Sequence, residues 1–213
     1  MNREFGDMTT TAIDGAAHVR ELFTRSIAVK RQIVEAHTGV IADIAIRCAD
    51  AIEAGGKLLL CGNGGSAADA QHLAAELLVR LRPHMNRSGI AALPLAIDSS
   101  SLTACGNDYS YDAYFERMTQ ALGRKGDVLL GITTSGKSKN IIKALAAARA
   151  MGMGTIGFLG GDGGDALAHC DLALVVPSHE TGRIQECHIT AGHAVMELVE
   201  DILLARHVIS AVE

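Results

Sequence analysis

The sequence lacks tryptophan, and only 3% of its 213 residues are aromatic, so few rings are available to stack on nucleic-acid bases. It also lacks an excess of basic residues: 19 lysines and arginines stand against 24 aspartates and glutamates, for a formal net charge of -5. A nucleic-acid backbone is bound mainly through lysine and arginine. Nucleic acid is therefore not an expected partner.

Long apolar runs are missing as well. No stretch approaches the roughly 20 apolar residues that cross a bilayer, and residues 1–15 contain no apolar core of a signal peptide. The five cysteines form no CxxC pair and leave one without a partner, which fits a reducing compartment better than a disulfide framework. We therefore expect a cytoplasmic protein with no membrane segment, in which the cysteines have structural roles.

Proline is scarce, with three residues in the chain, and no repeat or low-complexity tract marks an internal boundary. A chain of this length with 48% hydrophobic residues can bury one substantial core and is short for two catalytic domains. We expect a single domain over residues 1–213, with a helical extension at 1–55 and an α/β core at 56–213.

Hydrophobic periodicity gives the expected fold. Helical spacing predicts two leading helices over residues 12–36 and 39–54, and short buried strands are predicted for KLLLCG, IAALPLAI, DVLLGIT, GTIGFLG and LALVVP. Strands that alternate with helices of ten or more residues need crossover connections. The sequence predicts a five-stranded parallel sheet with helices on both faces, of the flavodoxin-like type, and two leading helices that pack against a partner subunit.

Two loops follow strands of this sheet, where open parallel sheets bind their ligands. The glycine loop, residues 62–66 (GNGGS), precedes a helix whose free N–H groups and dipole favour an anion. The hydroxyl loop, residues 133–138 (TTSGKS), places four hydroxyls within six residues, enough to surround a phosphate. Either loop could instead be a turn that caps a helix, but two such loops at one sheet edge favour a phosphate site. Neither has the spacing of a dinucleotide or Walker loop.

Two helices carry residues that suit acid/base or metal chemistry. His72 and Glu76 are four residues apart and share a helix face, although such a pair is also common as a surface contact. Gln185 and His193 are eight residues apart, about 12 Å along a straight helix. If both bind one ion, either Gln185 lies in an irregular first turn or one ligand comes from a neighbouring subunit.

Four segments, CGNGGSAADAQHLAAEL, CGNDY, GDVLLGITTSGKS and TGRIQECHITAGH, resemble the phosphoheptose isomerases, also called sedoheptulose 7-phosphate isomerases, of the sugar-isomerase (SIS) domain superfamily. The resemblance covers nearly the whole chain. It implies a homotetramer with shared active sites that converts sedoheptulose 7-phosphate to D-glycero-D-manno-heptose 7-phosphate. That product leads to nucleotide-activated heptose for surface glycans such as lipopolysaccharide.

The resemblance also implies roles for single residues. Substrate contacts fall on Asn63, Gly64, Gly65, Glu76, Asn107, Asp108 and Gln185, and phosphate contacts on Ser66, Thr133, Thr134, Ser135 and Ser138. In zinc-containing members the ligands of one zinc ion per subunit fall on His72, Glu76, Gln185 and His193. The chain departs from common family residues at Thr133, Lys137 and Gly182, and the last departure removes a carboxylate that could contact the sugar.

Moving a carbonyl between C1 and C2 requires a base, an acid and stabilisation of the enediol between them. Glu76 is the expected base and His193 its partner, although the two roles could be exchanged. Two alternatives stay open: an isomerase of another sugar phosphate, and a non-catalytic SIS regulatory or replication-initiator-associating protein. Relatives of the latter kind lack the carboxylate and the final histidine, so their presence here favours an enzyme.

Overall fold

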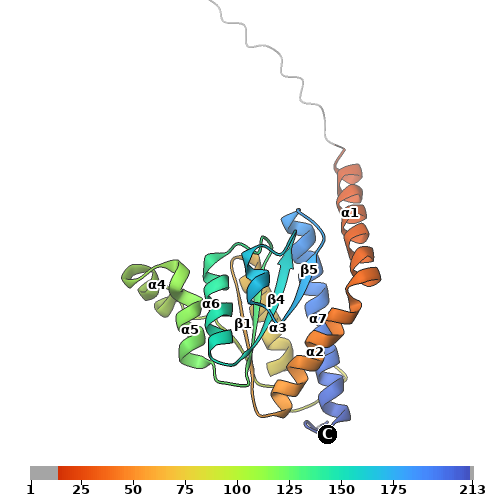
Figure 1. Cartoon of the computed structure of the whole chain (residues 1–213). Helices are drawn as coiled ribbons and strands as arrows, with labels where there is room; N and C mark the ends of the chain where they lie inside the picture. The colour runs from red at the N-terminus through yellow and green to blue at the C-terminus, as the bar shows by residue number, and fades with distance from the viewer. Residues whose placement is uncertain (1–13, 212–213) are drawn as a thin grey trace, which may run out of the picture.

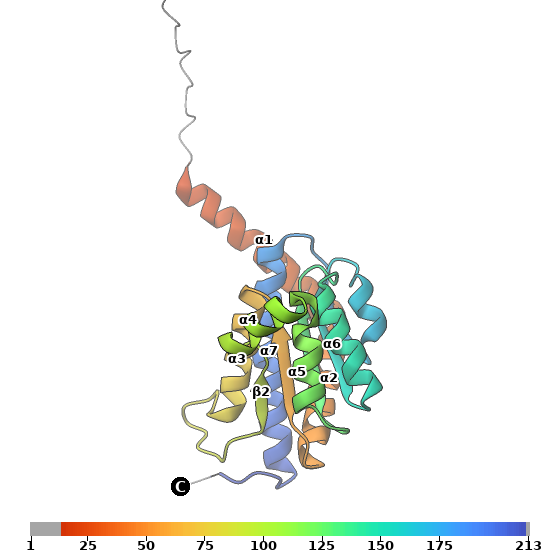
Figure 2. The ribbon, with the colours of Figure 1, turned by 90° about the vertical axis from the view of Figure 1, so that its left-hand side faces the viewer.

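The computed structural model describes residues 14–211 (Figure 1). Two helices precede the sheet, α1 (Gly15–Ala36) and α2 (Thr38–Glu53), and the carboxylate of Asp14 caps the first by accepting the backbone N–H of Ala17. Both match the predicted helices within a few residues; the predicted start at residue 12 lies outside the described residues. α1 projects beyond the body of the molecule in both views (Figures 1 and 2).

The sheet has five parallel strands, as predicted, and their order is β2-β1-β3-β4-β5. Each lies in a run chosen from the sequence: β1 (Leu58–Gly62), β2 (Ala92–Pro94), β3 (Val128–Thr133), β4 (Gly154–Gly160) and β5 (Leu172–Val176). β2 is shorter than its run of eight residues, because it is an edge strand and Pro94 has no N–H to donate to a ladder. The flavodoxin-like topology is confirmed.

Five further helices cover the two faces of the sheet: α3 (Gly65–Leu78), α4 (Ser99–Asp108), α5 (Tyr114–Leu122), α6 (Lys139–Ala150) and α7 (Thr181–Ala205). Two short 3₁₀ segments, η1 (Tyr111–Ala113) and η2 (Asp165–His169), complete the described chain. α5 packs beside α6, and α3 packs beside α7, as Figure 2 shows.

Alternating side chains of β1 divide the core into two layers. Leu58 and Leu60 face the layer that contains residues of α2, α3 and α7, whereas Leu59 and Cys61 face the layer that contains residues of α5 and α6. α3 and α7 therefore lie on the same face of the sheet although more than 100 residues separate them in the chain. This placement decides which polar side chains can meet.

The described residues contain no helix that is both long and apolar enough to span a membrane. All five cysteines are free thiols. Burial raises the pKa of Cys48 and of Cys61 to about 12, so neither thiol forms a reactive thiolate at neutral pH. This fits the expectation that the cysteines have structural roles.

Candidate functional site

Three polar side chains converge where α3 and α7 pack together: His72 and Glu76 from α3, and His193 from α7. The Nε2 atom of His72 lies 3.1 Å from Oε1 of Glu76 and 2.8 Å from Nε2 of His193. One ligand atom from each residue lies within 4.8 Å of the other two. We call these residues the triad; the chain thus brings together the carboxylate and the imidazole that the sequence analysis paired.

The donor atoms of the triad are of the kinds that bind metal ions. It offers two imidazole nitrogens and a carboxylate oxygen, which are common zinc ligands, and tetrahedral ligands about 2.0–2.1 Å from zinc lie about 3.3 Å apart. The separations of 2.8 and 3.1 Å in the triad are close to that value. Two imidazole nitrogens at this distance either share a proton or face a common cation. The residues present therefore fit a divalent cation.

Gln185 lies away from the triad within one chain. Its amide packs on Gly65, the first residue of α3, where Nε2 would stand 2.8 Å from an added Cβ atom. Gly65 precedes His72 by seven residues, about 10 Å along the helix. α7 is helical from Thr181 onward, so the alternative of an irregular first turn at Gln185 is wrong. The Gln185 amide therefore contacts the start of α3 rather than the turns that carry His72 and Glu76.

Asp69 is a carboxyl group near the triad that the sequence analysis missed. Partial burial raises its pKa, while the charges of His72 and His193 act in the opposite direction. It lies three residues before His72 on α3, so its position on the same helix face was visible in the sequence. The site therefore contains a second carboxyl group beside Glu76.

The glycine loop turns tightly into α3. A Cβ atom on Gly62 would lie 2.4 Å from the carbonyl oxygen of Ser66, so a larger residue cannot replace this glycine without moving the loop. Gly64, with φ of 55°, is the N-cap residue, and no side chain caps the helix. Ser66 is buried but is not the cap. The alternative that a side chain of this loop caps the helix is therefore wrong.

The hydroxyl loop gathers its side chains at the start of α6. The hydroxyl of Thr133 lies 3.0 Å from that of Ser138 and 3.5 Å from that of Ser135, which accepts the backbone N–H of Lys137 at 3.1 Å. Ser138 makes no capping bond to α6. The loop turns through Gly136, whose φ is 64°. These hydroxyls face one another, as a group that surrounds one phosphate would.

An asparagine pair joins the glycine loop to the first turn of α6, the helix that follows the hydroxyl loop. The side-chain amides of Asn63 and Asn140 donate to each other at 2.9 and 2.8 Å, and the hydroxyl of Tyr111 donates to Asn63 Oδ1 at 2.6 Å. Asn140 is buried in the first turn of α6. Neither Asn140 nor Tyr111 was predicted, because a buried amide link across 77 residues leaves no local pattern. The pair fixes the position of the glycine loop relative to α6.

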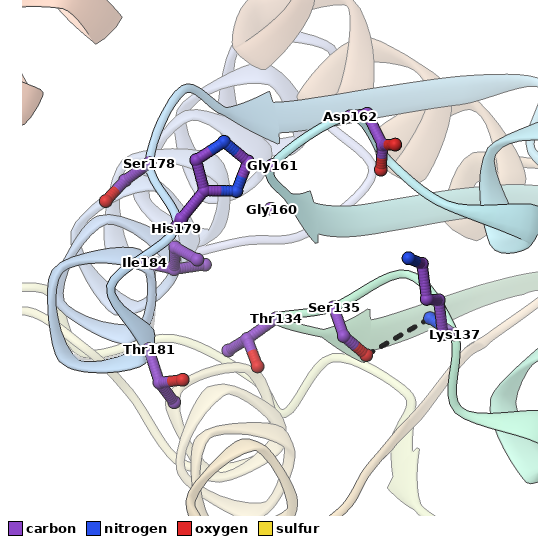
Figure 3. Close-up of a pocket in the computed structure, with 10 residues that line it drawn as sticks. All are labelled: Thr134, Ser135, Lys137, Gly160, Gly161, Asp162, Ser178, His179, Thr181 and Ile184. Atoms are coloured by element: carbon purple, nitrogen blue, oxygen red, sulfur yellow. Dashed lines mark hydrogen bonds between the residues drawn. The ribbon is translucent and has the colours of Figure 1, made fainter.

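A cavity of about 250 Å³ opens beside the hydroxyl loop, at the carboxyl ends of β3 and β4 and the start of α7 (Figure 3). Thr134, Ser135 and Lys137 line one side, and His179 and Asp162 lie across from them. The backbone N–H of Gly164 holds the pKa of Asp162 below its usual range, and the charge of Lys137 adds to this effect. His179 and Asp162 were not predicted, and no triad residue lines the cavity.

Two further predictions concern residues that belong neither to the triad nor to the lining of the cavity. Asn107 and Asp108 lie exposed at the end of α4, where the Asn107 amide donates to the Asp108 carboxylate at 2.7 Å, so their substrate contacts stay a prediction. At Gly182, in the first turn of α7, an added Cβ atom would meet nothing within 4 Å. The open space at this position leaves room for a ligand group but provides no side chain to bind it.

Comparisons with known proteins agree with this architecture. Residues 21–160 match the SIS domain family. The phosphoheptose isomerase of Paramagnetospirillum magneticum is 52% identical over 91% of this chain and 90% of its own, and that of Roseiflexus sp. is 53% identical over 84% and 89%. The structure of phosphoheptose isomerase from Neisseria gonorrhoeae superposes with a TM-score of 0.82, at 41% identity, over 87% of this chain and 98% of its own. The chain therefore belongs to the phosphoheptose isomerases of the SIS-domain family.

Proposed function

We propose that the chain isomerises sedoheptulose 7-phosphate to D-glycero-D-manno-heptose 7-phosphate, the first step towards nucleotide-activated heptose. Relatives that share about half of its residues over most of its length carry the name phosphoheptose isomerase. The observation that carries the proposal is the meeting of Glu76 and His193 at the contact of α3 with α7. A carboxylate and an imidazole side by side supply the base and the acid of an aldose–ketose isomerase.

In the proposed reaction Glu76 removes the proton from C1 of the ketose and returns a proton at C2. His193 moves protons to and from the two oxygen atoms, so that the carbonyl shifts through an enediol. Ser66 and the hydroxyl loop hold the phosphate, far from the reacting carbons, and thereby orient the sugar. The asparagine pair of Asn63 and Asn140 supports this task by holding the glycine loop against the first turn of α6, which follows the hydroxyl loop.

We propose one zinc ion per subunit at the triad, with Gln185 of a neighbouring subunit as the fourth ligand. When bound, zinc would supply a Lewis acid that stabilises the enediolate oxygens. Glu76 would be a weaker base while it is a ligand, so either it would leave the ion during turnover or the ion would serve mainly to organise the site. The donor set of the triad supports a cation, and its identity as zinc rests on the family resemblance.

We propose that the enzyme is a homotetramer whose active sites are shared between subunits. The outer face of α1 supports this: Phe23 is 67% exposed and Val34 66%, which is unusual for large apolar side chains. Val19 and Ile27 of the same helix are also half exposed. A second copy that covered α1 would bury this face, and it could also bring a Gln185 to the triad of its neighbour.

We also propose a cytoplasmic location and a single SIS domain over residues 1–213. The free and mostly buried cysteines support the first proposal. For the second, the layer of core that contains Ile44 of α2 also contains Leu60 of β1 and Val195 of α7, so the leading helices and the sheet share packing.

The regulatory alternative has no specific observation in its favour. Solved structures described as an RpiR transcription factor of Sphaerobacter thermophilus and as the NanR protein of Vibrio vulnificus are 20% and 18% identical to this chain, which shows a shared fold and nothing more. The chain retains Glu76 and His193, the two residues that an isomerase needs. A different sugar phosphate is distinguished from the heptose only by assay, because the phosphate loops contact the end of the substrate that such sugars share.

A panel of ketose phosphates tests the proposed function. The purified protein is incubated with sedoheptulose 7-phosphate, and with pentulose and hexulose phosphates, in the presence and absence of a chelator, and products are identified by NMR. We expect turnover of the heptulose phosphate well above that of the others, and its loss on chelation. Faster turnover of a shorter sugar phosphate would show that the proposed substrate is wrong. If the metal-loaded protein converted no sugar phosphate, the proposal that it is an isomerase would be wrong.

A further inference from the structure

Arg87 is a buried arginine in the connection between α3 and β2, and none of the proposed chemistry uses it. The residue is 6% exposed. Its guanidinium donates to the backbone carbonyl oxygens of Glu76 and Leu77, both at 2.8 Å, and of Ser88 at 2.9 Å. Its Nε–H donates to the carboxylate of Glu200 at 2.5 Å. One side chain thus joins a helix end, its own loop and a second helix.

The carbonyl contacts close the end of α3. The last four carbonyl groups of a helix have no partner within the helix, and α3 ends at Leu78. Arg87 satisfies those of Glu76 and Leu77, and its positive charge is favourable at a helix carboxyl end. The backbone of the residue proposed as the base is therefore held directly by this arginine.

The carboxylate contact reaches the helix that carries the other reacting residue. Glu200 lies seven residues after His193 on α7, which is two helical turns and the same face. Its side chain is 1% exposed, and its second oxygen accepts a hydrogen bond from Nε of Arg82 at 2.8 Å. Arg87 consequently connects the backbone of Glu76 to α7, at a point two helical turns after His193.

We propose that Arg87 is a positioning residue, which sets the separation of Glu76 and His193 by bridging the end of α3 to Glu200 of α7. The inference rests on the proposed function. An arginine is required because its planar group offers five N–H donors in fixed directions, whereas lysine offers three donors from a single point. A buried ion pair adds little stability compared with apolar packing, so its presence here is better explained by placement of the two helices.

A small displacement of Glu76 is expected to matter. Misplacement of a reacting group by about 1 Å can lower the reaction rate about 100-fold. Substitution of a residue that orients a metal ligand typically lowers the metal affinity about 10- to 100-fold. The hydroxyl loop lies on other segments, and Ser66 lies in the first turn of α3, at the end opposite to the one that Arg87 contacts, so substrate binding should change little. Loss of the bridge should therefore lower kcat and zinc affinity while KM stays nearly constant.

The test compares Arg87→Lys with Arg82→Lys. Both changes keep the charge and both residues contact Glu200, but among these two only Arg87 contacts the carbonyl groups of α3. The measurements are kcat and KM with sedoheptulose 7-phosphate, zinc affinity by competition with a chromogenic chelator, and the folded fraction by circular dichroism. For Arg87→Lys we expect kcat and zinc affinity to fall about tenfold or more, with KM within about twofold. For Arg82→Lys we expect kcat, KM and zinc affinity each to change by less than about threefold.

Folded Arg87→Lys protein with the kcat and zinc affinity of the wild type would overturn the inference, as would equal losses in both variants. If Arg87→Lys does not fold, Glu200→Gln takes its place, because it weakens the same bridge while keeping an acceptor, and the same outcomes apply. Failure of the proposed function is recognised separately: wild-type protein would then not isomerise the sugar, whereas the zinc measurement would still compare the two arginines.

Discussion

Glu76 and His193 are the residues on which the proposed chemistry depends. They come from helices on the same face of the sheet and meet at His72 Nε2. Glu76→Gln and His193→Gln should each lower kcat by about 100-fold or more, the usual contribution of a general acid or base. Steady-state kinetics with sedoheptulose 7-phosphate measures this effect.

The matched control for these two variants is Glu197→Gln, which changes an exposed carboxylate four residues beyond His193 on α7. Its kcat should stay within about twofold of the wild type, since surface substitutions rarely disturb the fold. Near-normal turnover in both Glu76→Gln and His193→Gln would remove the assignment of base and acid.

His188 makes the free energy of unfolding depend on pH. The residue is fully buried, and burial lowers its pKa from 6.5 to about 4, although Nε2 lies 2.9 Å from the carbonyl oxygen of Leu159. Between pH 6.5 and about 4 the unfolded chain binds a proton that the folded chain does not bind. The free energy of unfolding should therefore fall as the pH falls through this window, by about 3 kcal/mol at most from this residue.

Urea unfolding at several pH values from 7 to 4, for the wild type and for His188→Gln, measures that contribution. Glutamine keeps a side-chain donor near Leu159 but does not titrate. The wild type should lose more stability on acidification than the variant, because carboxylates titrate in both and cancel in the comparison. Equal losses in the two proteins would show that His188 does not remain neutral through burial.

At the scale of elements, the contact of α3 with α7 decides whether the triad forms. Gly192, next to His193, lies so close to α3 that an added Cβ atom would stand 2.6 Å from a methyl group of Leu73, which is fully buried. Gly192→Ala should therefore push the helices apart, with a cost of about 1–3 kcal/mol for overpacking, and should lower kcat by moving His193 away from His72. Thermal unfolding and kinetics test both effects.

Gly182→Ala provides the control for stability. Gly182 lies on the same helix, and an added Cβ atom there meets nothing within 4 Å. Both substitutions gain up to about 1 kcal/mol of helix propensity, so the difference between them isolates the contact with Leu73. A Gly192→Ala protein as stable and as active as the wild type would contradict close packing of α3 on α7.

The elements themselves were largely predictable. Apolar runs identified all five strands, and the alternation of strands with helices was enough to predict a parallel sheet, because such strands need crossover connections. The spacing of His72 and Glu76 is local and was visible. The partners that depend on packing were not: Asn140 and Arg87 are a buried amide and a buried guanidinium whose partners lie on other elements, and neighbouring residues do not indicate them.

At the scale of the whole molecule, one chain holds the parts of the site in separate places. The triad lies between α3 and α7, the cavity lies at the hydroxyl loop, and Gln185 packs on Gly65. The apolar outer face of α1 is exposed. The proposed homotetramer would account for these features together, because a neighbouring subunit would cover α1 and supply the proposed fourth ligand of the triad.

Subunit complementation tests the shared site. His193→Gln and Gln185→Ala are each expected to be poorly active, and the two proteins are mixed by co-expression. If His193 and Gln185 of one site come from different subunits, random assembly should restore about one quarter of the sites. Light scattering should give a mass four times that of the 22.3 kDa chain. A monomer, or a mixed tetramer without recovered activity, would show that the site is not shared in this way.

Solvent-deuterium incorporation at C2 of the product measures directly whether Glu76 carries the proton between the two carbons. In heavy water the wild type should convert sedoheptulose 7-phosphate into an aldose with deuterium at C2. In Glu76→Gln the rate of this incorporation should be lower by about 100-fold or more. Incorporation by folded Glu76→Gln at the wild-type rate would contradict the assignment. So would wild-type product that contains no deuterium, because the hydrogen would then have moved without passing through a base that exchanges with water.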